Sequence, residues 1–222
     1  QYSEKDEQCN AYIEHMRSDI DYLWNLDSDE IYKKEDIEKT IAFLEQEKPT
    51  SVGVRSLSFY GGFENYLTGF ELNRDNFLRI FRVTEGSRWL THRPPTIQYP
   101  KEHNIVKKHI DSNSFFEQTG VQMYHYSYVF PLQVKNKVEY YKAKVSRQKC
   151  IDDYYNKIYL PWMKGEDFDR FHLERKYEGV HEFKPEYRGP CYTEQFVGDH
   201  PKAIKNSLQD LNDRIIREMK DE

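Results

Sequence analysis

The sequence has few cysteines and no long hydrophobic run, and each of these absences excludes a class of protein. Its 222 residues include three cysteines, which lie far apart at Cys9, Cys150 and Cys191. An odd number of well-separated cysteines argues against a disulfide framework and predicts a reducing compartment, the cytoplasm. No apolar stretch approaches the roughly 20 residues that a membrane-spanning helix needs, and no signal peptide is visible.

The chain also lacks an excess of positive charge. It carries 33 Lys and Arg against 38 Asp and Glu, which gives a net charge of −5. This balance gives no reason to predict a nucleic-acid partner, so any anion site must be local. By contrast, aromatic residues are abundant at 15%, with 18 Tyr and 13 Phe. Such a composition indicates a folded chain, with one large domain or two small ones.

An apolar run that ends in three carboxylates is the most informative stretch. Residues 22–26 are almost continuously apolar, which is typical of a strand buried on both faces within a parallel sheet. Asp27, Asp29 and Glu30 follow directly, and burying even one of them unpaired would cost several kcal/mol. Asp27 and Asp29 point to the same side of an extended chain, so we expect both to bind one Mg²⁺ or Mn²⁺ ion. Turn and helix-cap chemistry is the alternative for the same residues.

The order of periodic segments predicts an α/β fold. Strands are expected at 22–26, 51–59, 77–83, 88–91 and 121–128. Helices are expected at 4–18, 34–48, 132–145, 148–159 and 201–220, the fourth of them ending near Pro161. A partly helical segment is expected at 105–117, and a turn-rich one at 166–193. Early alternation of helices and strands favours a parallel core followed by a helical and irregular C-terminal part.

His125 is a candidate metal ligand, and two arginines are candidates for binding diphosphate. His125 lies among aromatic residues of a predicted strand, where it is either a hydrogen-bonded core residue or a third ligand to the metal ion. Arg79 and Arg82 lie on the predicted strand at 77–83 and have the two-pronged geometry that binds diphosphate. A solvated strand face is the alternative reading of both arginines.

Four further residues are candidates for catalysis or substrate binding. Arg93 precedes proline, which forces an extended backbone, and its guanidinium could bind a diphosphate. His92 shares this rigid segment, which suits a side chain held against a substrate. Glu85 and Asp111 are possible general bases, each of which must reach the proton of the nucleophile. An ordinary turn is the alternative for His92, and a surface position is the alternative for Glu85 and Asp111.

The order and spacing of these motifs resemble family 2 glycosyltransferases with the GT-A fold. The first similarity is Gln8-Cys9-Asn10 on a helix, followed by the strand and acidic cluster at 21–30. The second is His125-Tyr126-Ser127-Tyr128, followed by a Lys- and Tyr-rich helix with Lys135 and Lys137. The third is Phe196-Val197-Gly198-Asp199-His200-Pro201 before the last helix. The similarity runs from about residue 4 to 205.

The resemblance implies a GT-A-like mixed sheet flanked by helices and a metal-dependent sugar transfer. Asp27 and Asp29 would hold Mg²⁺ or Mn²⁺ on a nucleotide-sugar donor, Glu30 would orient the site and His125 would complete it. Asn10 would contact the nucleotide, although Cys9 stands where many relatives have Arg. A saccharide or other hydroxyl acceptor would displace the diphosphate with inversion of the anomeric carbon. Some relatives have His-Glu where this chain has His92-Arg93.

Two alternatives stay open beside this reading. A nucleotidyltransferase also uses acidic residues at a strand end, and a non-catalytic carbohydrate-binding or scaffold fragment could keep the fold. The sequence does not determine the oligomeric state.

The position of the acidic cluster also leads to expectations about domains. We expect residues 1–145 to form the metal and acceptor side of the catalytic domain, with 146–222 packed on it as an extension. The cluster follows one helix and one strand, whereas a nucleotide-binding fold normally spends two βαβ units before it. We therefore expect that the first nucleotide-binding strands lie outside this sequence. We also expect an exposed or differently covered edge at 22–26 and weak nucleotide binding by these residues alone.

Overall fold

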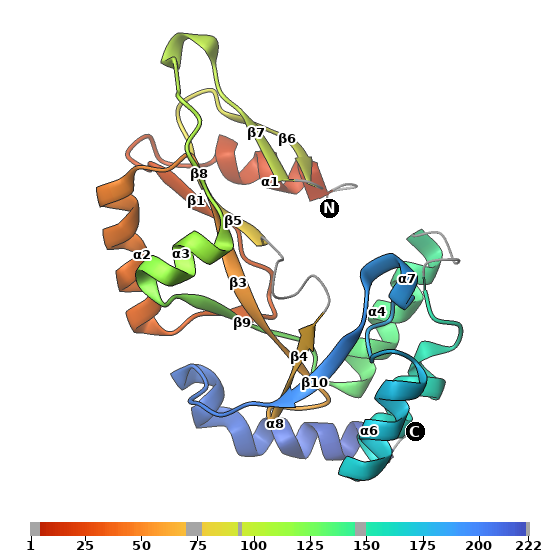
Figure 1. Cartoon of the computed structure of the whole chain (residues 1–222). Coiled ribbons are helices and arrows are strands. Elements are labelled where there is room, and N and C mark those ends of the chain that lie inside the picture. The colour runs from red at the N-terminus through yellow and green to blue at the C-terminus, as the bar shows by residue number, and fades with distance from the viewer. Residues whose placement is uncertain (1–4, 70–76, 93–94, 145–149, 221–222) are drawn as a thin grey trace. The chain divides into compact units, whose positions relative to one another are not determined.

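The computed structural model describes residues 5–69, 77–92, 95–144 and 150–220, and these form a mixed α/β structure (Figure 1). The chain divides into two compact units whose segments interleave along the sequence. The first unit contains Gln1–Asp27, Glu35–Arg55 and Asn76–Val121, and the second contains Ser28–Lys34, Ser56–Asp75 and Gln122–Glu222. The expected division at residue 145 stays a prediction. None of the described helices has the length and apolar character needed to cross a bilayer.

The first unit is built on a mixed sheet. Strand β1 (Tyr22–Trp24) pairs antiparallel with β5 (Phe77–Arg82), and β5 pairs antiparallel with the first half of β3 (Ser51–Tyr60). Strand β8 (His109–Ile110) runs parallel to β3. The predicted strands at 51–59 and 77–83 are therefore confirmed, and the sheet contains both strand orientations.

Residues 22–26 were predicted to form a strand buried on both faces within a parallel sheet. This prediction is wrong for β1. The strand is shorter, its three residues are half-buried, and it lies at the end of the strand order with an antiparallel neighbour. Leu23 packs against a core cluster that includes Cys9 and Phe81, which accounts for its apolar character. Among the described residues β1 has one strand partner, which agrees with the expected exposed or differently covered edge at 22–26. A short apolar run cannot distinguish these two kinds of strand.

In the described part of the first unit, the α-helices are α1 (Lys5–Glu14), α2 (Lys34–Glu47) and α3 (Ser112–Thr119). Helices α2 and α3 meet through Phe43 and Phe115, whose ring centroids lie 5.0 Å apart in an edge-to-face contact. Helix α1 lies beside the antiparallel hairpin of β6 (Arg88–His92) and β7 (Pro95–Gln98), as Figure 1 shows. A 3₁₀ turn, η2 (Lys101–His103), follows the hairpin. The helices predicted near 4–18 and 34–48 and the strand at 88–91 are confirmed, and the helical part of 105–117 begins at Ser112.

The second unit contains the other half of β3. Strand β2 (Glu30–Ile31) pairs antiparallel with β9 (Gln122–Tyr128), which also pairs with β3. Strand β4 (Asn65–Gly69) pairs antiparallel with β3 and with β10 (Cys191–Gln195). The strand predicted at 121–128 is confirmed. Strands β4 and β10 were not predicted, because their pairing joins segments more than 120 residues apart and leaves no local pattern.

Helices of the second unit follow the predictions except around Pro161. Helix α4 (Pro131–Lys144) and helix α8 (Lys202–Lys220) are confirmed. Residues 148 and 149 of the helix predicted at 148–159 lie outside the described residues. The described part contains a π-helical turn (Tyr155–Tyr159), which continues as α5 (Leu160–Lys164). Pro161 lies in the first turn of α5, where its missing N–H is tolerated, so the predicted stop there is wrong. The turn-rich segment contains α6 (Asp167–Lys176) and the short α7 (Pro185–Arg188).

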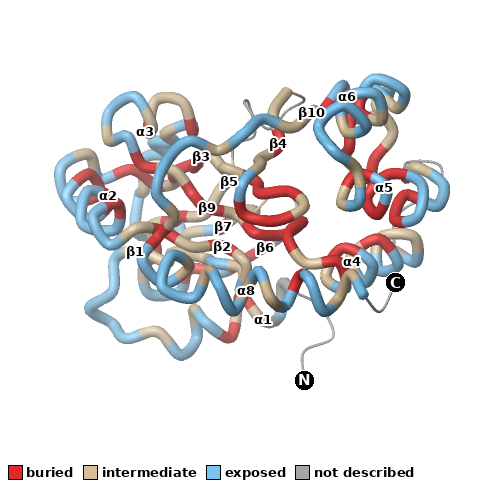
Figure 2. Tube along the Cα trace, turned by 90° about the horizontal axis from the view of Figure 1, so that it is seen from below, coloured by how far each residue is buried: buried red, intermediate tan, exposed pale blue. Residues whose placement is uncertain are grey.

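Two aromatic clusters form the core of the second unit. Helix α8 packs four apolar side chains against Phe59, Phe63 and Tyr126, namely Ile204, Leu208, Leu211 and Ile215. Tyr60 contacts the rings of Tyr159 and Trp162 in a second cluster. Figure 2 shows much of β3 and β9 buried, whereas α2 of the first unit alternates between buried and exposed residues. Strands and helices therefore both supply buried residues to these clusters.

Gly61 is the tightest backbone position beside these clusters. It has φ +64°, which favours glycine, and it begins the turn after β3. A Cβ added there would lie 2.7 Å from Cε3 of Trp162 and nearer still to Cζ3. Trp162 is 1% exposed and its Nε1 donates to Glu174 at 2.9 Å, so the ring has no room to move. The approach of these two residues therefore requires glycine.

Gly61→Ala is expected to lower the free energy of unfolding by roughly 2–5 kcal/mol, since it adds backbone strain to an overlap with a fixed ring. Gly120→Ala is the matched control, because Gly120 has φ +70° but nothing within 4 Å of an added Cβ. That control is expected to lose only about 1–2 kcal/mol, from backbone strain alone. Urea unfolding of both variants checks the difference. Equal losses would show that the contact with Trp162 carries no energy.

Candidate functional site

Asp29 and His125 form the centre of the candidate site, and both belong to the second unit. The pairing of β2 with β9 places Glu30 opposite His125, and the N–H of Tyr126 donates to the Asp29 carbonyl at 2.8 Å. This register brings Oδ2 of Asp29 to 3.7 Å from Nε2 of His125. Glu30 itself is buried in β2. The structure thus brings together Asp29, Glu30 and His125, which the sequence analysis linked to one metal site.

The Asp29 carboxylate is held in its charged form. Burial raises the pKa of Asp29, but the contact with His125, the charge of His125 and that of Lys137 together outweigh burial and lower it below 3.8. A carboxylate that is partly withdrawn from water and still ionised at neutral pH has the character of a ligand for a hard cation.

Strand β9 presents a polar face at this site. Residues two apart on a strand point to the same side, so Ser127 shares a face with His125. Nδ1 of His125 lies 3.5 Å from Oγ of Ser58 on β3, and Nζ of Lys137 on α4 donates to Oγ of Ser127 at 3.0 Å. The polar face therefore carries a carboxylate, an imidazole, two hydroxyl groups and an ammonium group.

The buried carboxylate of Glu182 binds Tyr128, whose ring Lys137 also contacts. Glu182 is 1% exposed, accepts a hydrogen bond from the Tyr128 hydroxyl and lies 3.2 Å from Nδ1 of His181. Burial raises the pKa of Glu182, but the charges of His181 and Lys137 and the bond from Tyr128 outweigh it and lower the pKa. The Nζ of Lys137 lies 3.9 Å from the centroid of the Tyr128 ring. The positive charge of Lys137 thus contributes to lowering the pKa of both Asp29 and Glu182.

Asp27 and Asn10, two further predicted site residues, belong to the first unit. Asp27 forms an ion pair with Arg79, with 3.6 Å between Oδ2 and Nη2. Asn10 on α1 binds the backbone of Trp89 twice, since its Oδ1 accepts from the N–H at 2.8 Å and its Nδ2 donates to the carbonyl at 3.0 Å. Asn10 therefore attaches α1 to β6. The metal contact of Asp27 and the nucleotide contact of Asn10 stay predictions.

The remaining candidates lie around β6 and α3 of the first unit. Glu85 is exposed in the turn between β5 and β6, and His92 ends β6. Arg93 lies outside the described residues. Asp111 caps α3, and its side chain accepts from the N–H groups of Asn113 and Ser114 and from the Ser114 hydroxyl. These hydrogen bonds lower the pKa of Asp111, which favours the cap over a general base.

The donor set can be tested against a divalent cation. Among the described residues, no group of three or more His, Cys, Asp or Glu side chains is placed to hold a metal ion. Asp29 and His125 supply two ligand atoms at 3.7 Å, close to the roughly 3 Å between neighbouring ligands of an octahedral ion. Mg²⁺ is commonly held by one or two carboxylates together with substrate phosphates and water. Asp29 and His125 therefore fit as part of a metal site that substrate completes.

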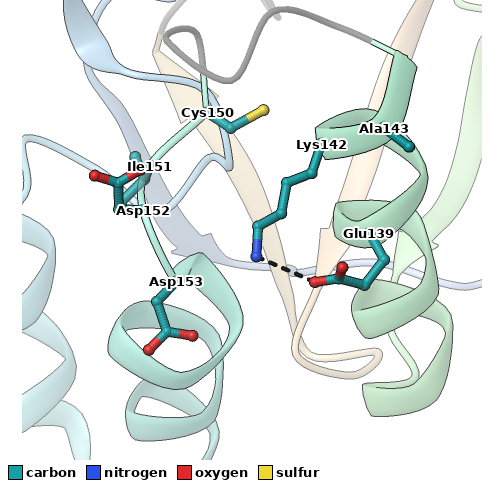
Figure 3. Close-up of a pocket in the computed structure, with 7 residues that line it drawn as sticks. All are labelled: Glu139, Lys142, Ala143, Cys150, Ile151, Asp152 and Asp153. Carbon is teal, nitrogen blue, oxygen red and sulfur yellow. Dashed lines mark hydrogen bonds and ion pairs between the residues drawn. The ribbon is translucent and has the colours of Figure 1, made fainter.

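A pocket of about 420 Å³ in the second unit contains none of the predicted site residues. Figure 3 shows it between the end of α4 and the segment from Cys150 to Asp153, with Lys142 and Glu139 paired at 3.1 Å. Asp153 accepts from Nδ2 of Asn156 at 2.8 Å. Lys142, Glu139 and Asp153 thus bind residues close to them in sequence, and the pocket carries no assigned chemistry.

Sequence reasoning missed three residues of the site: Ser127, Lys137 and Glu182. Ser127 could have been found, because it lies two residues after His125 in a predicted strand. Lys137 was noted only as a member of a Lys- and Tyr-rich helix. Glu182 left no signal, since it lies in a turn-rich segment 54 residues from its partner Tyr128.

His200 joins the start of α8 to the core of the second unit. Its Nε2 lies 2.9 Å from the Phe63 carbonyl, which can only accept, so Nε2 carries the proton. Its Nδ1 therefore accepts from the Tyr126 hydroxyl at 3.0 Å. Burial is the main cause that lowers the pKa of His200 below 6.5. The neutral imidazole is thus the form that the fold selects.

Comparison with known proteins gives one result. A family model described as glycosyl transferase family 2 matches residues 3–121, which include Asn10, Asp27, Asp29, Glu85 and His92. The match covers more than half of the chain. No curated protein and no solved structure matches.

We expect stability to fall as the pH drops from 7.5 to 5.5 because of His200. Its folded pKa lies below the unfolded value, so the unfolded state binds the proton first, and stability present above pH 6.5 is lost as the pH falls toward the folded pKa. The loss from one group is at most about 1.4 kcal/mol per pH unit. His200→Gln should remove this component, whereas His172→Gln, at an exposed position on α6, should keep it. Urea unfolding at both pH values checks this, and an unchanged pH dependence in His200→Gln would contradict it.

Proposed function

Since this chain belongs to glycosyl transferase family 2, we propose that it moves a sugar from a nucleoside diphosphate donor to a hydroxyl acceptor with a divalent metal ion. The family membership makes the protein a glycosyltransferase in general terms. It favours that activity over the nucleotidyltransferase and the non-catalytic carbohydrate-binding alternatives. The donor, the metal and the stereochemistry are parts of the proposal.

The pair of Asp29 and His125 is the observation that carries the metal part. The two side chains come from segments almost 100 residues apart in sequence, and the β2–β9 register holds them 3.7 Å from each other. The lowered pKa of Asp29 keeps its carboxylate ready to bind a cation at neutral pH. The predicted role of Asp27 as a further ligand belongs to the same proposal.

The residues of the polar face would have different roles in binding the metal ion. Asp29 and His125 would hold Mg²⁺ or Mn²⁺, which when bound neutralises charge on the leaving diphosphate. Ser58 lies against the other nitrogen of His125 at 3.5 Å, so the imidazole ring has a defined orientation toward Asp29. Glu30, buried opposite His125 in β2, fixes the backbone that carries Asp29.

The proposed reaction is a direct displacement. A base removes the proton from the acceptor hydroxyl, the hydroxyl oxygen attacks the anomeric carbon, and the diphosphate leaves with the bond electrons. This single displacement inverts the configuration of the sugar. Glu85 and His92 are the proposed catalytic residues, and Arg93 is the proposed contact to the diphosphate.

Asp29→Asn is expected to reduce metal-dependent transfer by at least about 100-fold in the full-length protein, because a neutral amide is a poor ligand for a hard cation. Donor turnover with Mn²⁺ in the presence of acceptor is the measurement. Asp152→Asn is the matched control, since Asp152 is exposed and lies in the same unit.

Unfolding must be followed in parallel, because loss of the contact with His125 also affects stability. The expected pattern is a folded Asp29→Asn protein without metal-dependent transfer and an Asp152→Asn protein with full activity. Full Mn²⁺-dependent turnover by folded Asp29→Asn would show that the metal is held elsewhere.

A further inference from the structure

Lys137 carries a charge that no carboxylate of the described chain neutralises by direct contact. Its Nζ donates to Oγ of Ser127 at 3.0 Å and lies over the ring of Tyr128. No Asp or Glu among the described residues lies within ion-pair distance of it. An ammonium group has three N–H donors, and Ser127 accepts from one of them. Lys137 therefore keeps hydrogen-bonding capacity for an anion from outside the protein.

The position of Lys137 relates it to the Asp29 and His125 pair. Ser127, its partner, lies on the same face of β9 as His125, because residues two apart on a strand share a side. Nζ of Lys137 donates to Oγ of Ser127 at 3.0 Å, which places the ammonium group on that face. The ammonium thus adjoins the polar face at which the metal ion would be held.

The surroundings of Lys137 also limit its movement. The Tyr128 hydroxyl is bound to Glu182, and Tyr128 is 4% exposed, so its ring is fixed. An ammonium over an aromatic face at 3.9 Å is attracted by the ring as well as by the hydroxyl of Ser127. A lysine side chain normally loses much conformational freedom when it binds a ligand. Here a large part of that loss has already occurred on folding.

We propose that Lys137 binds a phosphate oxygen of the donor diphosphate beside the metal ion. The inference rests on the proposed function, since it assigns a residue to the same donor site. Lysine is a common point-charge partner of phosphate, and a bond between charged groups is about twice as strong as a neutral one. A neutral acceptor hydroxyl would gain little from a full positive charge. The diphosphate is therefore the group that matches this residue.

Calorimetric titration of the protein and three variants tests the assignment. The probes are Mn²⁺ alone, pyrophosphate with Mn²⁺, which presents the diphosphate without a base, and UDP and GDP with Mn²⁺. Lys137→Gln should weaken binding of pyrophosphate, UDP or GDP roughly tenfold or more. Its affinity for Mn²⁺ alone should stay equal or rise, because a cation next to Asp29 is removed. Lys137→Arg keeps the charge and should retain most of the diphosphate affinity.

Lys135→Gln is the matched control. Lys135 lies two residues away on α4, is exposed, and its Nζ lies 5.5 Å from the centroid of the Tyr155 ring. This variant should bind all probes like the wild type. Thermal unfolding of each variant confirms that the fold is kept.

The outcomes separate this inference from the proposed function. If the wild type binds diphosphate with Mn²⁺ and Lys137→Gln binds it equally well, Lys137 does not contact the donor and only the inference fails. If folded Lys137→Gln loses Mn²⁺ and diphosphate together, Lys137 supports the metal site structurally, which also contradicts the inference. If the wild type binds neither pyrophosphate nor UDP or GDP with Mn²⁺, the proposed donor site is wrong, and the inference falls with it.

Discussion

Burial of ionised carboxylates beside cations is the constraint on which the second unit depends. Glu182 is buried and Asp29 is partly withdrawn from water, and each has a pKa lowered by neighbouring positive groups. An unpaired carboxylate in such a place would cost several kcal/mol, so His125, His181 and Lys137 cannot be removed without a penalty. These charges attach the segment before β2 and the segment after α6 to β9 and α4. In the proposed function, the same arrangement that stabilises the unit would also bind a cation and an anion.

Alternate residues of β9 point to opposite faces of the strand, so one face packs against the core and the other carries polar groups. Tyr124 and Tyr126 point into an aromatic cluster with Phe59 and α8. His125 and Ser127 point to the other side, where their partners are polar. Rigid packing on one face therefore fixes the positions of the functional groups on the other. Preorganisation of this kind is what metal and phosphate binding require of a protein.

Much of the fold could be predicted from the sequence, because the amphipathic helices and the longer strands have clear periodicity. The α/β class was expected, the resemblance implied a mixed sheet, and the family match agrees with the GT-A fold. The parallel core inferred from the order of elements is contradicted by the antiparallel pairs of β5 with β1 and β3. The predicted position of β1 inside a parallel sheet was wrong, since an apolar run in an edge strand has the same sequence pattern as an apolar run in an interior strand. Strands β4 and β10 were not predicted, because they are defined by pairing between segments that are distant in the sequence.

The sequence predicted some residues of the candidate site but not the contacts between them. Asp29 and His125 were identified by residue type and motif order, and the β2–β9 register brings them together. Lys137 and Glu182 could not be identified, since their roles come from tertiary proximity to Ser127 and Tyr128. The hydrogen bonds by which Asn10 joins α1 to β6 also could not be identified, since they come from tertiary contact with the Trp89 backbone.

The central claim is that a divalent cation binds at Asp29 and His125, and paramagnetic broadening by Mn²⁺ tests it most directly. The imidazole resonances of the eight histidines can be compared in one titration. At low Mn²⁺, His125 should broaden first and strongly, whereas His200 and His172 should change little. Asp29→Asn should abolish this selectivity. Equal broadening of all histidines, or selective broadening of His125 that survives in Asp29→Asn, would contradict the account.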